Sequence, residues 1–169
     1  MKKLFTLLTL AICLFALKPS QATAQSYNTA IGIRLGYHYG LSVKHFMKSN
    51  MALEGIFSTR GYGNKHWDHF GWNLTGLLKW QNQFATAKGL SWYAGIGAHI
   101  GRWHAAHYDK RWNDNAYHFV FGLDGVLGLE FAIPSTPIAL SLDWKPAFDM
   151  VGGSHFIGDG FALTFRFGF

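Results

Sequence analysis

Large apolar residues alternate with small or polar ones along most of this chain. The pattern is clearest at the C-terminal end, GFALTFRFGF, residues 160–169. Apolar side chains occupy alternate positions there: Phe161, Leu163, Phe165, Phe167 and Phe169. The residues between them are small or polar and include Arg166. An alternation with a period of two predicts a β-strand with one apolar face.

Seven further segments show the same period, and no segment after residue 24 has a convincing helical pattern. The expected strands are 29–39, 41–48, 52–60, 71–81, 91–103, 117–133, 138–148 and 160–169. Three of the connections are long (61–70, 104–116 and 151–159), and they alternate with turns or compact links. Long loops that alternate with short turns, together with an even number of strands, are typical of a barrel in the outer membrane.

The amount of apolar side chain decides which face points outward. The interior of an eight-stranded barrel is only just wide enough for side chains to fill. The apolar faces carry more bulk than that interior holds, so we expect them to face lipid. The prediction is an all-β fold, an eight-stranded antiparallel transmembrane β-barrel, which satisfies every backbone hydrogen bond in hydrocarbon. The alternative is a soluble lipocalin-like barrel or sandwich, whose exterior would be the small, sparsely charged face.

Aromatic residues fall near the ends of the expected strands, as interfacial anchoring requires. The expected periplasmic belt contains Trp80, Trp92, Phe131 and Phe169. The opposite belt contains Tyr37, Tyr39, Trp72, Phe148 and Phe161.

The first 24 residues have the pattern of an export signal. Lys2 and Lys3 precede an apolar run, residues 4–17, and Ala22-Thr23-Ala24 supplies small residues for a cleavage site. The run is too short for a membrane-spanning helix, which needs about 20 apolar residues. A lipoprotein signal is rejected because Ile12, before Cys13, is not small. We therefore expect a cleaved signal peptide, residues 1–24, and one barrel domain, residues 25–169.

Net charge and cysteine content narrow the range of possible partners and of stabilising bonds. Loss of residues 1–24 removes three lysines, so 12 basic and 9 acidic residues remain and the net charge falls from +6 to +3. The basic residues are scattered, so we expect no nucleic-acid partner. Cys13, the single cysteine, also leaves with the signal, and no disulfide is expected.

Charged residues on the small faces of the strands should lie inside the barrel. They are Arg34, Lys44, Glu54, Lys79, Asp124, Glu130, Asp143, Lys145 and Arg166. Isolated buried charges are unfavourable, so these five basic and four acidic groups should pair and plug the lumen. A gated narrow pore is the alternative. The facing of Lys44 and Glu54 depends on register, because a bulge would reverse either.

The signal peptide, the eight alternating segments and the terminal phenylalanines resemble the small eight-stranded outer-membrane barrels of Gram-negative bacteria, the OmpA/OmpX-like group. The stretches GLSVKHF, LEGIFSTR, DGVLGLEF and LSLDWKPAF also resemble members of this group. The resemblance implies a location in the cell outer membrane, with lipid as the surrounding partner. It also implies recognition of Phe165, Phe167 and Phe169 by the barrel-assembly machinery. The group contains structural proteins, adhesins, narrow channels and a few lipid-modifying enzymes.

The expected loops contain other candidates for binding or chemistry. Two histidine pairs, His66 with His69 and His104 with His107, have side chains suited to zinc, copper or haem. Exposed histidines without a ligand are the simpler interpretation, so we expect no metal and no cofactor. Aromatic loop residues offer a surface for an extracellular partner. They are Tyr62, Trp67, Tyr108 and Trp112.

A lipid-modifying enzyme is the remaining class. Ser154 and His155 are adjacent, with Asp149 and Asp159 nearby. No nucleophile motif surrounds Ser154, and neighbours in sequence usually point in different directions, so we expect no enzyme. The sequence favours a structural or surface-interaction role, with a narrow channel for small solutes as the alternative.

Overall fold

The computed structural model describes residues 27–36, 38–60, 71–104, 117–151, 155–158 and 160–169. Over these residues the chain is all β, and none of them forms a helix long and apolar enough to cross a membrane. The strand segments are β1 (Thr29–Gly36), β2 (Tyr39–Lys48), β3 (Met51–Arg60), β4 (Gly71–Gln83), β5 (Leu90–His104), β6 (Tyr117–Ala132), β7 (Ile138–Trp144), β8 (Ala147–Val151), β9 (His155–Ile157) and β10 (Phe161–Gly168).

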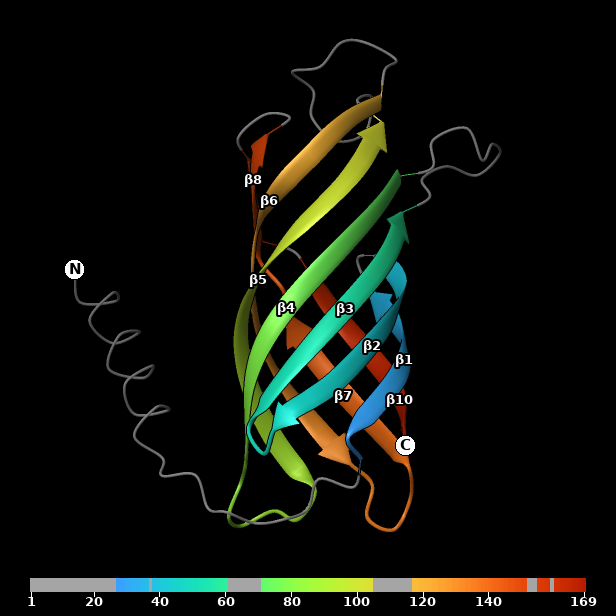
Figure 1. The fold of residues 1–169 in the computed structure, drawn as a ribbon, viewed down its shortest axis with the longest axis vertical. Helices are drawn as coiled ribbons and strands as arrows, with labels where there is room; N and C mark the ends of the chain where they lie inside the picture. Colours follow the sequence, from blue (N-terminus) through green and yellow to red (C-terminus); the bar gives the residue numbers. More distant parts are fainter. Residues whose placement is uncertain (1–26, 37, 61–70, 105–116, 152–154, 159) are drawn as a thin grey trace, which may run out of the picture.

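The segments form one closed antiparallel barrel (Figure 1). The sheet runs β5-β4-β3-β2-β1-β10-β7-β6-β8-β9, and the additional β5–β6 pairing closes it. Segments β7 and β8 both pair with β6 and together form the seventh barrel strand. Segments β9 and β10 pair with β8 and β7 and form the eighth. The predicted eight-stranded antiparallel barrel is therefore confirmed.

The seventh strand is interrupted between Trp144 and Ala147. Pro146 has no N–H to donate to the ladder, which confines proline in sheets to edges and irregular positions. Its carbonyl oxygen instead accepts a hydrogen bond from the Gly125 N–H at 2.9 Å, and the Lys145 N–H donates to the Gly160 carbonyl at 2.9 Å. The interruption leaves the backbone bonded to both neighbouring strands, so the wall remains closed.

Most expected strand boundaries lie within two residues of the observed ones, and two differences are informative. Tyr39 begins β2, whereas the alternation had placed it at the end of the first strand. The seventh strand continues through β8 to Val151, beyond the expected end at residue 148. Alternation identifies a face, but it does not show where the chain reverses.

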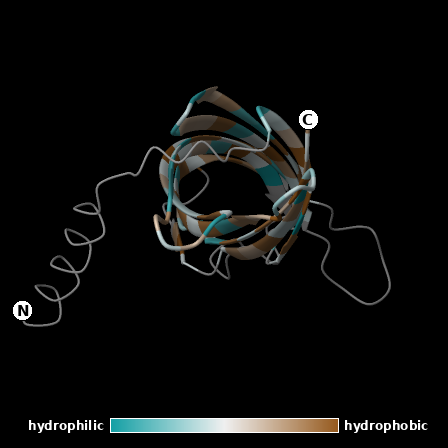
Figure 2. Ribbon diagram, turned by 90° about the horizontal axis from the view of Figure 1, so that it is seen from below, coloured by the Kyte–Doolittle hydropathy of each residue, from teal (hydrophilic) through white to brown (hydrophobic). Residues whose placement is uncertain are grey.

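The two faces of the wall have opposite chemistry. Leu129 and Phe165 are 47% and 45% exposed on the outer face, whereas Arg166 and Asp143 are each 2% exposed on the inner face. Figure 2 shows the resulting alternation of hydrophilic and hydrophobic positions along the strands. The barrel is thus apolar outside and polar inside, the reverse of a soluble barrel.

Glycines on the inner face make room for large polar side chains. A Cβ on Gly128 would lie 2.6 Å from both the Tyr93 ring and the Asp143 Cβ. Tyr93 is fully buried, and its hydroxyl donates to Asp143 at 2.7 Å. A side chain at residue 128 would therefore have to displace one of these two hydrogen-bonded groups.

We expect Gly128→Ala to lower the free energy of unfolding by about 1–3 kcal/mol, the usual effect of overpacking. Gly55→Ala is the matched control, because Gly55 is also in mid-strand and a Cβ there would meet no atom within 4 Å. Urea unfolding of the two variants in the same bilayer would measure the difference. Equal stabilities would show that the space beside Tyr93 is not limiting.

Candidate functional site

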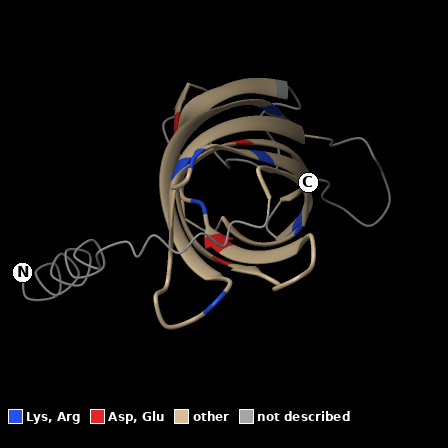
Figure 3. Cartoon of the chain, turned by 60° about the horizontal axis from the view of Figure 1, so that its bottom comes forward, with Lys and Arg blue, Asp and Glu red and all other residues tan. Residues whose placement is uncertain are grey.

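Lysine, arginine, aspartate or glutamate side chains from every barrel strand except β5 lie inside the barrel, and β5 contributes His99. Figure 3 shows basic and acidic positions spread around the ring rather than gathered on one side. Lys145 is half-buried, and the other eight predicted lumen residues are buried: Arg34, Lys44, Glu54, Lys79, Asp124, Glu130, Asp143 and Arg166. The end of the barrel that carries Tyr27 and Phe169 is called the terminal end below, and the opposite end is called the loop end.

Arg166 of β10 is the centre of a cluster near the terminal end. Its guanidinium donates to Glu54 at 2.5 Å, to Glu130 at 3.1 Å and to the Ser141 hydroxyl. Glu54 and Glu130 lie on β3 and β6, so one side chain links strands from three parts of the ring. Hydrogen bonds between ionised groups are about twice as strong as neutral ones, which makes this a strong cross-lumen connection.

Lys44 of β2 also binds the Glu130 carboxylate. Its ammonium donates to both Glu130 oxygens, at 2.8 and 2.9 Å, and to the Gln81 Oε1 at 2.6 Å. The Gln81 amide in turn donates to Glu130 at 2.9 Å and to Ser91 at 2.7 Å. The Glu130 carboxylate therefore has charged or amide donors from three other strands.

Two further ion pairs lie inside the barrel. Lys79 pairs with Glu54, and its ammonium lies 4.1 Å from the centre of the Tyr93 ring. Arg34 donates to both oxygens of Asp143, one of them at 2.8 Å. A two-pronged arginine–carboxylate pair fixes geometry as well as charge. Each of these charged groups therefore has an opposite partner from another strand.

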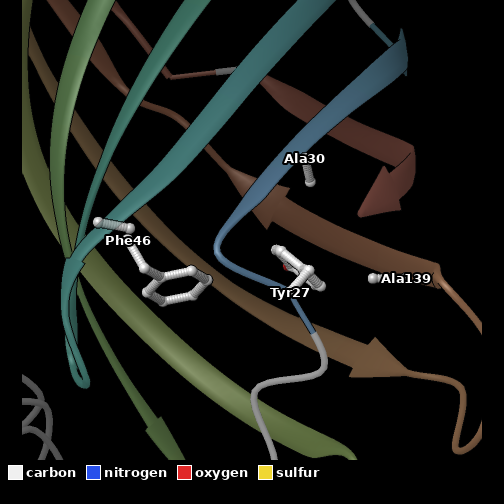
Figure 4. Close-up of a cluster of buried hydrophobic side chains, with 5 residues drawn as sticks. Tyr27, Ala30, Phe46 and Ala139 are labelled. Carbon is white, nitrogen blue, oxygen red and sulfur yellow. The ribbon is translucent and has the colours of Figure 1, made fainter. Parts of the chain in front are cut away.

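A group of buried apolar residues lies at the terminal end below this layer (Figure 4). Tyr27 precedes β1 and its ring packs 5.7 Å from the Phe46 ring, while its hydroxyl donates to Glu130 at 2.7 Å. Ala30, Ala52 and Ala139 complete the group. Tyr27 thus connects the polar layer to the apolar group.

A second cluster lies toward the loop end around His99. Its Nδ1 lies 2.7 Å from Asp124 and its Nε2 lies 2.9 Å from Asp149, and Lys145 also donates to Asp124. Ionised carboxylates only accept hydrogen bonds, so this geometry suits an imidazole with protons on both nitrogens. Two positive groups then balance two carboxylates.

Comparison with known proteins supports the fold directly. No protein-family model and no curated protein matches the sequence. The N-terminal β-barrel domain of Pseudomonas aeruginosa OprF superposes with a TM-score of 0.61 at 12% identity, covering 85% of this chain and 98% of that one. Neisserial surface protein A (NspA) superposes with a TM-score of 0.54 at 11% identity, covering 83% and 93%. The fold is that of a small outer-membrane barrel. The predicted resemblance is confirmed at the level of fold.

Sequence reasoning missed several polar residues of the barrel interior. Tyr27, Gln81, Tyr93, His99 and Asp149 all take part in the network. The alternation did place His99 on the small face, between glycines, which was a usable signal. The expected seventh strand ends one position before Asp149, so the alternation assigns that residue to neither face.

The structure also changes the interpretation of Asp149, which the sequence places near the candidate enzyme residues Ser154 and His155. It is fully buried and contacts His99, so it does not belong to a catalytic group at the rim of the barrel. Ser154 and Asp159 lie outside the described residues, as do the side chains of His104 and His155.

The remaining loop candidates cannot be placed in the barrel. His66, His69 and His107 lie outside the described residues, as do Tyr62, Trp67, Tyr108 and Trp112. Within the part of the chain that the structure describes, no three His, Cys, Asp or Glu residues form a group that could hold a metal ion.

Proposed function

We propose that this chain is an integral protein of the cell outer membrane with a structural or surface-interaction role. The observation that carries the proposal is the inverted wall, with exposed apolar residues outside and buried ion pairs inside. Among the described residues, every strand segment except β9 pairs with neighbours on both sides, and paired edges are what hydrocarbon requires. The fold shared with OprF and NspA supports the same location.

We propose further that the ion-pair network plugs the lumen. Arg166, Lys44, Lys79, Glu54 and Glu130 are each at most 2% exposed, and they come from five different barrel strands. A continuous water path through this layer would expose them. Removing one partner of a buried pair leaves an uncompensated charge, so the closed arrangement resists opening.

Single-channel recording in planar bilayers tests the plug, and we expect no reproducible conductance from the purified protein. A general porin, recorded in the same bilayer, is the positive control for insertion and detection. Reproducible conductance steps would overturn the plug and favour the alternative, a narrow channel for small solutes.

The membrane location has its own test. Unboiled protein should run faster on SDS gels than boiled protein, and the full chain should fractionate with outer membranes after expression in a Gram-negative host. Recovery in the soluble periplasmic fraction would contradict the location. If unboiled and boiled protein ran with the same mobility, that result would contradict a closed, detergent-resistant barrel.

Three further proposals concern the C-terminal phenylalanines, the long loops and catalysis. We propose that Phe165, Phe167 and Phe169, which are exposed on the outer face, are recognised by the assembly machinery. We also propose that an extracellular partner binds the long loops, and that the protein has no enzymatic activity. An unchanged lipid A mass spectrum in a deletion strain is the expected result for the last point.

A further inference from the structure

Two buried hydrogen-bond donors inside the barrel have no hydrogen-bond partner in the described part of the chain. They are the Nε of Arg166 and the hydroxyl of Ser42, and both residues are 2% exposed. The other guanidinium nitrogens of Arg166 donate to carboxylates and to a hydroxyl. The two further buried atoms without a hydrogen bond, Glu54 Oε2 and Lys79 Nζ, form an ion pair with each other. Leaving a buried donor unpaired is unfavourable, and an ordered water or a bound ion is one way to satisfy it.

The two donors belong to side chains that lie over the same glycine. Gly32 of β1 pairs with Arg166 on β10 and with Ser42 on β2, so it lies between them on the inner face. A Cβ on Gly32 would lie 2.8 Å from the Arg166 Cγ and 3.1 Å from the Ser42 Oγ. The next residue in this row, on β3, is the buried and apolar Ile56. Gly32 has no side chain to separate the two donors, and Ile56 offers neither of them an acceptor.

The buried charges around Arg166 do not sum to zero. Ion pairs, together with the Tyr93 ring and hydroxyl, join one set of charged side chains, called the Arg166 network: Arg34, Lys44, Lys79, Arg166, Glu54, Glu130 and Asp143. Four of these are basic and three are acidic, so the fully ionised network carries one excess positive charge. Tyr27 and Tyr93 donate to its carboxylates, so their hydroxyls keep their protons and add no negative charge.

The cluster around His99 does not remove this excess. Its carboxylates, Asp124 and Asp149, already contact the His99 imidazolium, and Lys145 donates to Asp124. A buried charge without compensation is strongly unfavourable. A water molecule beside Gly32 would satisfy the two donors and leave the charge unbalanced. An anion there would accept both hydrogen bonds and neutralise the network.

We propose that a small monovalent anion, of which chloride is the commonest, binds inside the barrel on the lumen side of Gly32. The Arg166 Nε and the Ser42 hydroxyl both donate to it. A monatomic anion accepts hydrogen bonds from any direction, which suits donors that come from two different strands. The inference depends on the buried network and not on a role at the cell surface, which conductance and fractionation test separately.

The dependence of stability on chloride tests this site. The barrel would be unfolded in urea and refolded into lipid bilayers while chloride replaces gluconate at constant ionic strength, so that the anion is present when the barrel closes. An ion that binds only the folded state lowers the ratio of unfolded to folded protein, by up to about tenfold for each tenfold rise in its concentration above the dissociation constant. We expect this dependence for chloride and for bromide.

Three variants show whether the dependence comes from the proposed site. Ser42→Ala should weaken the apparent affinity for chloride by about tenfold or more, because one hydrogen bond to a charged group is lost. Lys44→Gln removes the excess positive charge and should abolish the dependence. Ser58→Ala removes another buried serine hydroxyl, on β3, and is the matched control that should keep the dependence of the unchanged protein.

Anomalous scattering from crystals grown in bromide gives the position of the ion. We expect a peak within hydrogen-bond distance of the Arg166 Nε and the Ser42 Oγ. No chloride dependence and no such peak would overturn the inference and show that water satisfies the two donors. A chloride dependence that Ser42→Ala and Lys44→Gln both retain would place the ion elsewhere and would also overturn it. A peak only beside exposed lysines such as Lys48 or Lys88 would show an adventitious ion only.

Discussion

Replacing Arg166 with methionine is expected to lower the free energy of unfolding by about 3–5 kcal/mol, the usual effect of removing one partner from a buried ionic group. Arg166 is the only described side chain that donates to both Glu54 and Glu130, and its donors cross the lumen from β10 to β3 and β6. Lys79 and Lys44 would each remain beside one of these carboxylates, but neither reaches the other. Each of the two buried carboxylates would then have one positive group fewer beside it.

Urea unfolding in bilayers, followed by tryptophan fluorescence and by gel mobility, measures this effect. Arg166→Lys should recover part of the loss, because it keeps the charge without the forked geometry. Lys88→Met is the control for removal of a cation, since Lys88 is exposed in the turn before β5. A loss for Arg166→Met no larger than for Lys88→Met would show that the network contributes nothing to stability.

The sequence predicted the wall of this barrel well because one variable, the face of each residue, has a period of two. Eight of the nine predicted lumen charges are buried on the inner face of their strands, and Lys145, in the interruption between β7 and β8, is half-buried and donates to Asp124. The facing of Lys44 depended on the absence of a bulge, and the only register shift between β2 and β3 falls between Phe46 and Lys48, past Lys44. The inward facing of Lys44 is therefore not reversed.

The partners inside the lumen were not predictable in the same way. Lys44 and Glu54 are directly paired across β2 and β3, so neighbour reasoning would join them. Lys44 instead binds Glu130 across the lumen, and Glu54 binds Arg166 and Lys79. Cross-lumen contacts depend on the stagger of the whole closed sheet, which is set by eight pairings together. No local pattern contains that information.

The His99 cluster was missed for a related reason. Its two carboxylates come from β6 and from β8, and β8 exists only because the seventh strand resumes after Pro146. A proline in a strand pattern normally marks an edge or an end. In a closed barrel the neighbouring strands hold the chain through the interruption, so tertiary structure overrides the local signal.

Placing an arginine on the outer face at Leu127 is expected to destabilise the barrel by about 2–4 kcal/mol, the effect of such a charge near the bilayer midplane. Leu127 is 50% exposed and lies near the middle of the β6 stripe, the outward apolar positions of β6 from Phe119 to Phe131. In a soluble barrel the same substitution would place a charge in water and change little. The sign and size of the effect therefore depend on what solvent covers the outer face.

Thr59→Arg is the matched variant, because Thr59 lies on the outer face near the loop end of β3, paired with Tyr39 and Trp72. A charge near the interface should change the free energy of unfolding by about 0–1 kcal/mol. Equilibrium unfolding of both variants in the same lipid would give the difference between the two depths. Equal stability of Leu127→Arg and Thr59→Arg would show that hydrocarbon does not cover the middle of the β6 stripe. The exposed leucines and phenylalanines of the outer wall would then need a protein partner, and not lipid, to cover them.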